Sequence, residues 1–572
     1  MAEAELQWYE PFISHPESIE HMFIPEDFSE EEQLISKTTD LFVKNEVIPL
    51  LELTEKYDYK TIRDLFKASG ELGLLGIEVP EKYGGLSLNK KLSGLVAEKM
   101  GSGGSFSVSF NIHAGVGTLP YVYYGTEEQK KKYLPKLISG EWIGAYALTE
   151  PNAGSDALNA KTTAVLNKER TAWILNGEKQ WITNAKIADV YVVFAKTTEG
   201  MTSFIVERSF DGVSVGPEEK KMGIRGSSTA TLIMEEVSIP IENVLGTVGK
   251  GHHVALNILN MARLKLAFSN IGMSKQALAL SITYAKKRTQ FEKPIIYFSM
   301  IQEKIANMAI SIYGAESSAY RTAGRLDKLF TSDHSLEEKL KQLANYASEC
   351  AINKINCSEV LGRIVDEAVQ IHGGYGYMQE YEIERLYRDA RISRIFEGTN
   401  EINRLTIHKI IVNNVNQTKE LSPEPVFNNP GNRNQQFIQL SYWLFYKSLA
   451  ALKRSQILDD QDQDQEYARL LADMQIEIYQ MESVVVRTKK VIQKRQKERE
   501  LKEKMAHVLC EEGFRKVEAM ALTVLASIET DEKERKQLID EIHSLPIPIF
   551  SNLFYKKREI AARIAEHEKY IM

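Results

Sequence analysis

The sequence contains little cysteine, with only three such residues among 572. Cys350, Cys357 and Cys510 show none of the paired spacings that are typical of metal ligands. Cys350 and Cys357 lie two helical turns apart, and this spacing favours packing on a shared buried face over a redox pair. The sequence therefore predicts no metal site, and a reducing compartment suits such a chain.

Long hydrophobic runs and an excess of basic charge are also missing. No stretch approaches the ~18 consecutive apolar residues that a membrane-spanning helix needs. The first six residues lack the basic flank and apolar core of a signal peptide. The formal net charge of −7 argues against nucleic acid as the main partner. These absences predict a soluble, cytoplasmic protein.

What is present is a globular composition with 43% hydrophobic residues, and a length that predicts roughly three to four domains. The order of the patterns predicts helices, then a β domain, then helices, then a helical appendix. The expected fold class is thus mainly α with a central β domain. We expect an N-terminal helical domain at 1–140, the central β domain at 141–250, a helical bundle domain at 251–415, a linker at 416–436 and a helical extension at 437–572.

Helix starts and turn residues support this division. The segments 29–32 (SEEE) and 126–129 (TEEQ) are capping boxes that open helices. Short segments rich in Val, Ile, Thr and aromatic residues predict a small antiparallel sheet, with turn residues such as Asn176-Gly177 between them. These segments are 161–167, 171–175, 189–196, 201–206 and 228–234. Ala262 to Arg288 predicts one long helix, in which small residues such as Gly272 allow a partner helix to lie close.

The stretch 391–401 is the best candidate for chemistry. Glu397 follows the apolar residues Ile395 and Phe396, and Gly398, which has no Cβ, lets a ligand or another backbone approach closely. Desolvation in such surroundings raises the pKa of a carboxyl group towards the value that a general base needs. Glu397 is therefore a candidate active-site base, and a carboxylate that only caps a helix is the alternative.

Five motifs in sequence order give this candidate a context. They are 146–156 (YALTEPNAGSD), 180–184 (QWITN), 288–291 (RTQF), 370–376 (QIHGGYG) and 396–400 (FEGTN). Together they resemble the acyl-CoA dehydrogenase family, a set of flavoproteins with the same helix–sheet–helix order, and the resemblance covers about residues 30–412. The appended helical module further resembles the very-long-chain branch, which carries such a C-terminal extension.

The resemblance implies a bound FAD. In the family, the hydroxyl matching Thr149 bonds the flavin ring, the serine matching Ser155 touches flavin and acyl-CoA, and the pair matching Trp181 and Thr183 lies along the isoalloxazine. Without the family, Trp181 is better explained as sheet core, as buried tryptophan usually is. The cofactor-binding residues that the resemblance implies are Tyr146, Thr149, Ser155, Trp181, Thr183, Arg288, Phe291, Gln370, Gly374, Thr399 and Glu401.

Part of this set implies an oligomer. In the family, the positions of Arg288, Phe291 and the 370–374 loop reach the flavin dinucleotide of the neighbouring subunit. A planar guanidinium suits pyrophosphate, although without the family a solvated surface arginine explains Arg288 equally well. A monomer could then not build a complete cofactor site. We therefore expect an obligate homo-oligomer, and the extension favours a homodimer over a tetramer.

The same resemblance implies the reaction. Glu397 is expected to remove the α-proton of a fatty acyl-CoA thioester while a β-hydride passes to flavin N5, giving the trans-2-enoyl-CoA of β-oxidation. The Glu397 backbone amide and a ribityl hydroxyl of FAD are expected to form the oxyanion hole. Arg263, which lies at the family's separation from Arg288, is the second expected catalytic residue. The expected substrate-binding residues are Ser155, Asn260, Arg263 and Gly398. Asn260 departs from the medium-chain pattern, in which this residue is aspartate.

An electron-transferring flavoprotein is the expected electron acceptor, because nothing in the sequence resembles a nicotinamide site or a metal cluster. The resemblance in the extension favours a long acyl chain. The alternatives are an acyl-CoA oxidase that uses oxygen, and a flavin-binding interaction or assembly protein that uses the helical module as a docking surface. His372 replaces a more usual apolar residue of the family, and a neutral packed histidine is the better explanation for it.

The segment 487–504 contains nine basic and three acidic residues. A solvated helix face is the first explanation for this composition, and peripheral contact with anionic lipid is the alternative. The apolar residues around this segment form no clean stripe, which weakens the lipid hypothesis.

Overall fold

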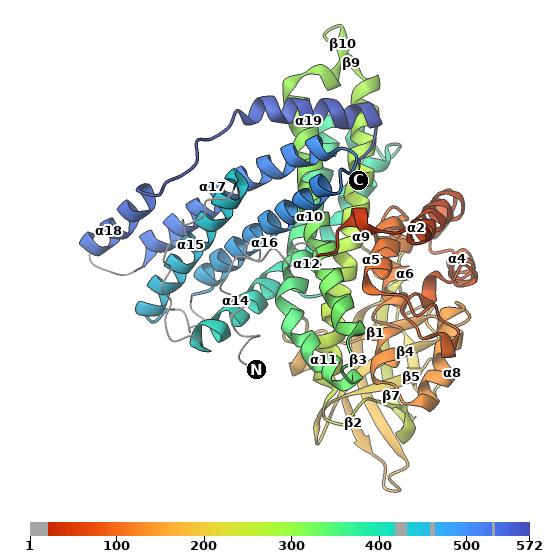
Figure 1. Ribbon diagram of the computed structural model, residues 1–572. Coiled ribbons are helices and arrows are strands. Elements are labelled where there is room, and N and C mark those ends of the chain that lie inside the picture. The colour runs from red at the N-terminus through yellow and green to blue at the C-terminus, as the bar shows by residue number, and fades with distance from the viewer. Residues whose placement is uncertain (1–20, 418–431, 458–463, 529–531, 572) are drawn as a thin grey trace.

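A computed structural model describes residues 21–417, 432–457, 464–528 and 532–571 of the chain. Helices precede and follow a central sheet, and a further helical module comes last (Figure 1). The predicted fold class, mainly α with a central β domain, is confirmed. Most of the predicted linker at 416–436 lies outside the described residues. The two ends of that linker belong to helices α14 (Asn400–Gln417) and α15 (Arg433–Arg454).

Both predicted capping boxes open helices of the N-terminal part. The Ser29 hydroxyl accepts a hydrogen bond from the Glu32 amide at 3.2 Å, and Thr126 accepts one from the Gln129 amide at the same distance. In each box the side chain of the later residue bonds back to the cap amide, so two otherwise unpaired donors are satisfied. The helices are α2 (Glu30–Phe42), α3 (Leu51–Thr54), α4 (Tyr59–Glu71), α5 (Lys90–Met100), α6 (Gly104–Ala114), α7 (Leu119–Tyr124) and α8 (Glu127–Ile138).

The central sheet is mostly antiparallel, with strand order β6-β7-β3-β2-β4-β5-β8 and β1 beside β4. The prediction of a purely antiparallel sheet is wrong in one respect, because β1 runs parallel to β4. Three short strands, β1, β6 and β8, were not predicted. The strands are β1 (Gly144–Ala147), β2 (Thr163–Leu166), β3 (Ala172–Thr183), β4 (Val190–Thr197), β5 (Gly200–Glu207), β6 (Val213–Val215), β7 (Thr229–Pro240) and β8 (Val244–Leu245).

The predicted turn at Asn176-Gly177 is wrong, because β3 continues through it. The pairing of β3 with β7 shifts register between Leu175 and Gly177, and Gly177 has φ +146°. A glycine inside a strand often marks a bulge of this kind, which bends the strand without ending it.

Helix α9 (Gly251–Lys287) is the central element of the bundle and starts earlier than the predicted Ala262. It packs against α5, α10 and α12. A Cβ at Gly272 would lie 1.8 Å from the Glu98 carbonyl oxygen on α5, so the predicted close helix approach is confirmed. The other elements here are β9 (Thr289–Gln290), β10 (Lys293–Pro294), α10 (Ser299–Thr331), α11 (Leu336–Leu343), α12 (Ala347–His372), α13 (Glu382–Ala390) and α14.

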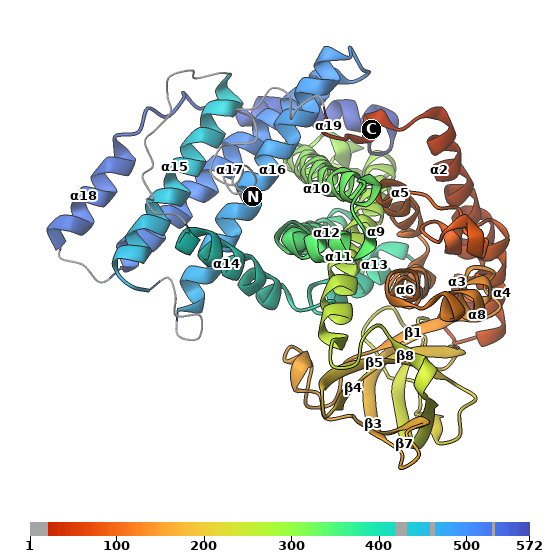
Figure 2. The ribbon, with the colours of Figure 1, turned by 60° about the horizontal axis from the view of Figure 1, so that its bottom comes forward.

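The C-terminal module contains five helices in its described part. Helices α16 and α17 pack against each other and against α10, and α15 packs on both (Figure 2). None of the described helices is both long and apolar enough to cross a membrane. The three cysteines are buried free thiols, as predicted. The helices are α15, α16 (Gln465–Gln493), α17 (Arg499–Ser527), α18 (Glu532–His543) and α19 (Leu553–His567).

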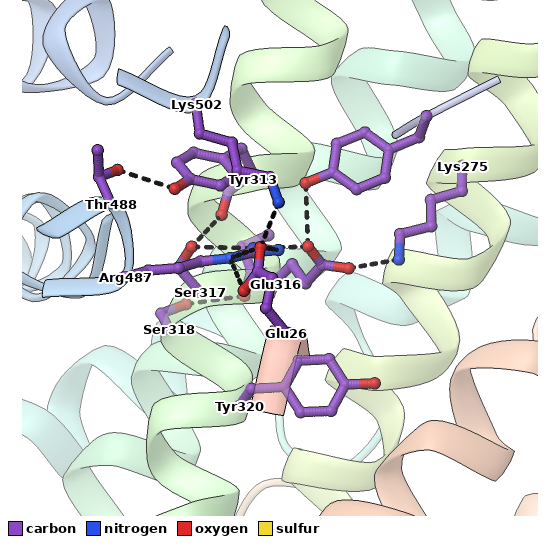
Figure 3. A network of polar contacts seen from close by, with 12 residues as sticks. Glu26, Lys275, Tyr313, Glu316, Ser317, Ser318, Tyr320, Arg487, Thr488 and Lys502 are labelled. Atoms are coloured by element: carbon purple, nitrogen blue, oxygen red, sulfur yellow. Dashed lines mark hydrogen bonds and ion pairs between the residues drawn. The ribbon is translucent and has the colours of Figure 1, made fainter. Parts of the chain in front are cut away.

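A buried polar network around Arg487 of α16 joins this module to the rest of the protein (Figure 3). The Arg487 side chain is fully buried and forms ion pairs with Glu26 at 2.8 Å and with Glu316 of α10 at 2.6 Å. Lys502 of α17 reaches Glu26 at 2.6 Å, and Lys275 of α9 reaches Glu316 at 2.5 Å. Segments that are far apart in the sequence therefore meet at two carboxylates.

The solvated helix face predicted for 487–504 is wrong in its main part. Arg487, Lys490 and Lys502 are buried, and Lys490 and Lys494 each pair with Asp27 at 2.5 Å. The partners come from the N-terminal segment and from α10, and no local pattern around residue 490 discloses them. These charges are compensated within the protein.

Replacing Arg487 with methionine should destabilise the protein by about 3–5 kcal/mol, because Glu316 and Glu26 would each lose a buried cationic partner. The measurement is the denaturation midpoint of the variant against the wild type. The matched control is Arg469→Met, which removes an exposed ion pair with Asp473 at 3.6 Å and should cost about 0.5 kcal/mol or less. Equal effects of the two substitutions would contradict the importance of the buried network.

Candidate active site

Glu397 lies on a short connection between a 3₁₀ turn at Arg391–Arg394 and helix α14. Glu397 and Gly398 both have left-handed backbone conformations, with φ +56° and +82°. This conformation strains a glutamate by about 1–3 kcal/mol but costs a glycine little. A Cβ at position 398 would also lie 3.2 Å from Asn403 Nδ2. The arm that carries Glu397 therefore needs Gly398, and it needs contacts that hold the strained residue.

Arg263 of α9 provides one of these contacts. Its Nε donates to the Glu397 carbonyl oxygen at 3.1 Å, and one terminal nitrogen donates to Asn260 Oδ1 at 3.0 Å. From the other side, Asn403 Nδ2 donates to the Gly398 carbonyl at 2.8 Å. The structure thus brings together Glu397, Arg263, Asn260 and Gly398, four of the residues expected at the catalytic and substrate sites.

The two remaining predicted residues of this arm lie at the start of α14. The Thr399 hydroxyl accepts from the Ile402 amide at 3.2 Å, which is the hydrogen bond of a helix N-cap. Glu401 is exposed on the first turn. A cap at Thr399 orients the helix that follows the base, and it leaves Glu397 itself outside the helix.

The environment of Glu397 suits a base. Burial raises the pKa of its carboxyl group to about 7, against the lowering effects of Arg263 and Lys354. Burial also lowers the pKa of Arg263, against the raising effect of Glu397, although a guanidinium stays charged. A carboxyl group with a pKa near neutrality can both accept a proton and release it at physiological pH.

A hollow lies directly in front of Glu397. Its wall is largely apolar, with Val108 and Ile112 from α6 and with Ala262 and Leu266 from α9. Lys265 also lines it and donates to the Ala114 carbonyl oxygen at 3.1 Å. The arrangement places one carboxyl base at an apolar hollow, which is suited to a hydrocarbon chain with an acidic C–H bond.

The residues predicted on the sheet lie at one side of this arm. Burial raises the pKa of Tyr146 on β1 well above its usual value, and the charge of Glu397 contributes, so the two groups are electrostatic neighbours. Thr149 and Thr183 are half-buried, and Ser155 is exposed. Trp181 is 58% exposed, so its assignment to the sheet core is wrong. It has φ +57° at a second register shift of β3, and this bulge places the indole at the surface.

The other predicted residues lie far from Glu397 in the same protomer. Arg288 follows the end of α9, 25 residues after Arg263, which corresponds to about 37 Å at 1.5 Å per residue. Phe291, at the tip of the β9–β10 hairpin, is 87% exposed, and Gln370 and Gly374 are exposed as well. Arg288 stacks over Tyr375 at 5.6 Å from the ring centroid. One protomer therefore carries two separated groups of predicted residues.

His372, beside this second group, is a packed histidine as predicted. Its Nδ1 bonds the Ala368 carbonyl oxygen at 2.7 Å, and its ring stacks on Tyr284 with centroids 4.3 Å apart. Burial lowers the pKa of His372, which favours the neutral ring.

One functional candidate was missed in the sequence. Lys354 of α12 is fully buried and donates from Nζ to the Gly398 carbonyl oxygen at 2.7 Å. A signal was present, because Lys354 lies at helical spacing from Cys350, Cys357 and Leu361, on a stripe that is otherwise apolar. A lysine at such a position needs a buried partner.

Comparison with known proteins decides the family. The N-terminal, middle and C-terminal domain models of acyl-CoA dehydrogenases match residues 29–141, 145–237 and 249–412, and a further C-terminal domain model of this family matches 444–540. A probable acyl-CoA dehydrogenase of Bacillus subtilis is 46% identical over 99% of both chains. The chain belongs to the acyl-CoA dehydrogenase family. Its activity is that of an oxidoreductase, and its cofactor is FAD.

Two further relatives extend this assignment. A crystal structure of an acyl-CoA dehydrogenase complexed with FAD from Bacillus anthracis is 44% identical, with a TM-score of 0.91, and the match covers 97% of this chain and 98% of that one. The very long-chain specific acyl-CoA dehydrogenase of Mus musculus is 41% identical over 60% of this chain and 52% of that protein. The chain thus spans about half of the mouse protein.

The residues around the site fit a bound FAD. A Cβ built at Gly154, Gly373 or Gly374 would meet no atom within 4 Å, so a ligand can approach the backbone at these positions. The Tyr146 hydroxyl is buried and has no hydrogen-bond partner in the described part of the chain. The exposed Trp181 supplies an aromatic surface. A flat polar ring system and a dinucleotide would complete such surfaces.

The raised pKa of Glu397 makes a prediction about stability. The unfolded chain ionises this carboxyl near its ordinary pKa of 4.5, whereas the folded protein holds the proton until about pH 7. The contribution of Glu397 is therefore fully present below pH 4.5 and is lost as the pH rises to about 7. Glu397→Gln should gain on the order of 2 kcal/mol relative to the wild type across this window. Melting of both proteins at several pH values measures it, and a pH-independent difference would contradict the burial of the charge.

Proposed function

We propose that this protein oxidises long-chain acyl-CoA to trans-2-enoyl-CoA in fatty acid β-oxidation, with Glu397 as the base that removes the α-proton. The observation that carries this proposal is a carboxyl group of pKa about 7 at an apolar hollow. The long-chain part is supported by the similarity to the very long-chain specific relatives and by the match of a family domain to the C-terminal module.

The residues of this chain divide the work around the α-carbon. The Glu397 carboxylate takes the proton and holds it, and Arg263 keeps the arm in place through the Glu397 carbonyl oxygen. The Glu397 amide donates to no acceptor in the described residues, so it is free to bond the thioester oxygen as charge develops there. Apolar residues such as Ile112 and Leu266 hold the acyl chain and exclude water from the carboxylate. When bound, FAD supplies the two-electron oxidation at the β-carbon.

We further propose that the working enzyme is a homodimer. Arg288, Phe291, Gln370 and Gly374 are exposed about 37 Å from the catalytic end of α9, too far to complete the same FAD site in one protomer. Exposed aromatic residues such as Tyr377 lie in the same region, which suits a surface that a partner covers. Analytical ultracentrifugation should show FAD-loaded dimers, and FAD-loaded monomers would refute this arrangement.

The electrons then have to leave the reduced flavin. We propose an electron-transferring flavoprotein as the acceptor. This acceptor agrees with an acyl-CoA dehydrogenase and would not serve an oxidase, which passes its electrons to oxygen.

Anaerobic addition of palmitoyl-CoA and octanoyl-CoA, in parallel, tests the reaction. The visible absorption band of the flavin should bleach, faster with the longer substrate, whereas Glu397→Gln should keep FAD bound and lose almost all of the rate. Failure of both substrates to bleach the wild type would refute the reaction. Faster bleaching by octanoyl-CoA would refute the chain-length part, and peroxide formation in air would indicate an oxidase.

Gly374→Val tests the cofactor site of the second group. The protomer has room for this side chain, so the fold should persist, while FAD retention should fall by at least about tenfold, or about 1.4 kcal/mol. Absorbance ratios after gel filtration measure retention. Gly362→Ala is the matched control on the neighbouring helix, because its added Cβ makes only ordinary contact with Arg394 at 3.7 Å. Equal retention by the two variants would exclude Gly374 from the site.

A further inference from the structure

Lys354 of α12 is the second buried cation that touches the arm. Its Nζ donates to the Gly398 carbonyl oxygen at 2.7 Å and to Asn400 Oδ1 at 2.8 Å. Asn400 is itself fixed, because its Nδ2 donates to Ser358 Oγ and to Glu359 Oε1 at 3.1 Å each. A lysine with no exposed surface therefore binds the residue that follows the base and the first residue of α14.

Together, Arg263 and Lys354 hold the strained part of the arm from two helices. Arg263 of α9 bonds the carbonyl oxygen of Glu397, and Lys354 of α12 bonds that of Gly398. These are the two residues with left-handed backbone, whose conformation persists only where the surroundings hold it. Both cations also act electrostatically on the Glu397 carboxylate.

We propose that Lys354 is a positioning residue for the base Glu397, holding the arm through the Gly398 carbonyl oxygen and keeping the carboxylate in its ionised, proton-accepting form. This inference rests on the proposed role of Glu397. It adds a residue that touches neither the acyl group nor the flavin and that acts through the base. The carboxylate and the ammonium titrate as a coupled pair, so proton uptake by one group affects the charge of the other.

The electrostatics agree with this geometry. Burial lowers the pKa of Lys354 to about 7, and the negative charge of Glu397 opposes that lowering. Lys354 in turn lowers the pKa of Glu397, after Arg263. The charged and titratable groups that face the pair are Arg263 and Lys265 on α9, Glu359 on α12, Glu401 on α14 and Tyr146 on β1. Among these groups Lys354 is the one whose own charge changes near neutrality together with that of Glu397.

Rapid anaerobic reduction of the FAD-loaded protein by palmitoyl-CoA, followed over a pH series, tests the proposal. In Lys354→Met the pH midpoint of the rate should move upward by roughly one unit, because the carboxylate loses a neighbouring cation. The rate at high pH should fall as well, because the arm loses a hydrogen bond. Lys354→Arg keeps a cation and donors, so its midpoint should stay near that of the wild type. Ser358→Ala, which changes the same polar cluster without changing a charge, should also leave the midpoint in place.

An unchanged midpoint in Lys354→Met, whatever its maximal rate, would overturn the proposal, because a residue that only supports the fold lowers the rate at every pH alike. If the methionine variant does not retain FAD, Lys354→Gln serves instead, since its amide can still donate to the Gly398 carbonyl oxygen without a charge. Failure of the proposed function looks different, because the wild type itself would then show no reduction by acyl-CoA at any pH.

Discussion

A left-handed turn at Glu397 and Gly398 is the constraint on which the active site depends. A glutamate does not adopt this conformation without support, and the support comes from buried donors on separate helices: Arg263 on α9, Lys354 on α12 and Asn403 on α14. The packing of the bundle and the position of the base are therefore one problem. The close contact of α9 with α5 at Gly272 contributes to it by fixing the helix that carries Arg263.

Buried ion pairs recur where the parts of this protein meet. The Arg487 network joins the N-terminal segment, two bundle helices and the C-terminal module through Glu26 and Glu316. Burying such charges is costly, and pairs of this kind are retained where every member has a partner. Burial of Glu397 follows the same rule, with the difference that its pKa stays near neutrality. The C-terminal module is thereby fixed to the catalytic bundle by charge as well as by apolar packing.

Local residue patterns predicted the parts of the structure that depend on near neighbours. The capping boxes at Ser29 and Thr126 were confirmed because all of their hydrogen-bond partners lie within three residues. Predictions that depended on distant partners failed. Trp181 looked like sheet core and is exposed at a bulge, and the basic segment after Arg487 looked solvated and is largely buried. Lys354 was missed for the same reason, because its acceptors lie 44 and 46 residues further along the chain.

The sequence by itself determined the fold class, the family and the candidate base, because hydrophobic periods, capping residues and ordered motifs are local and survive without coordinates. Only the tertiary structure decided which charges are buried and what compensates them. The pKa of Glu397, the grip of Arg263 and Lys354 on the arm, and the separation of Arg288 from Arg263 all follow from where helices cross and end. Electrostatic effects depend on distance and on exclusion of water, and neither quantity is written in the order of the residues.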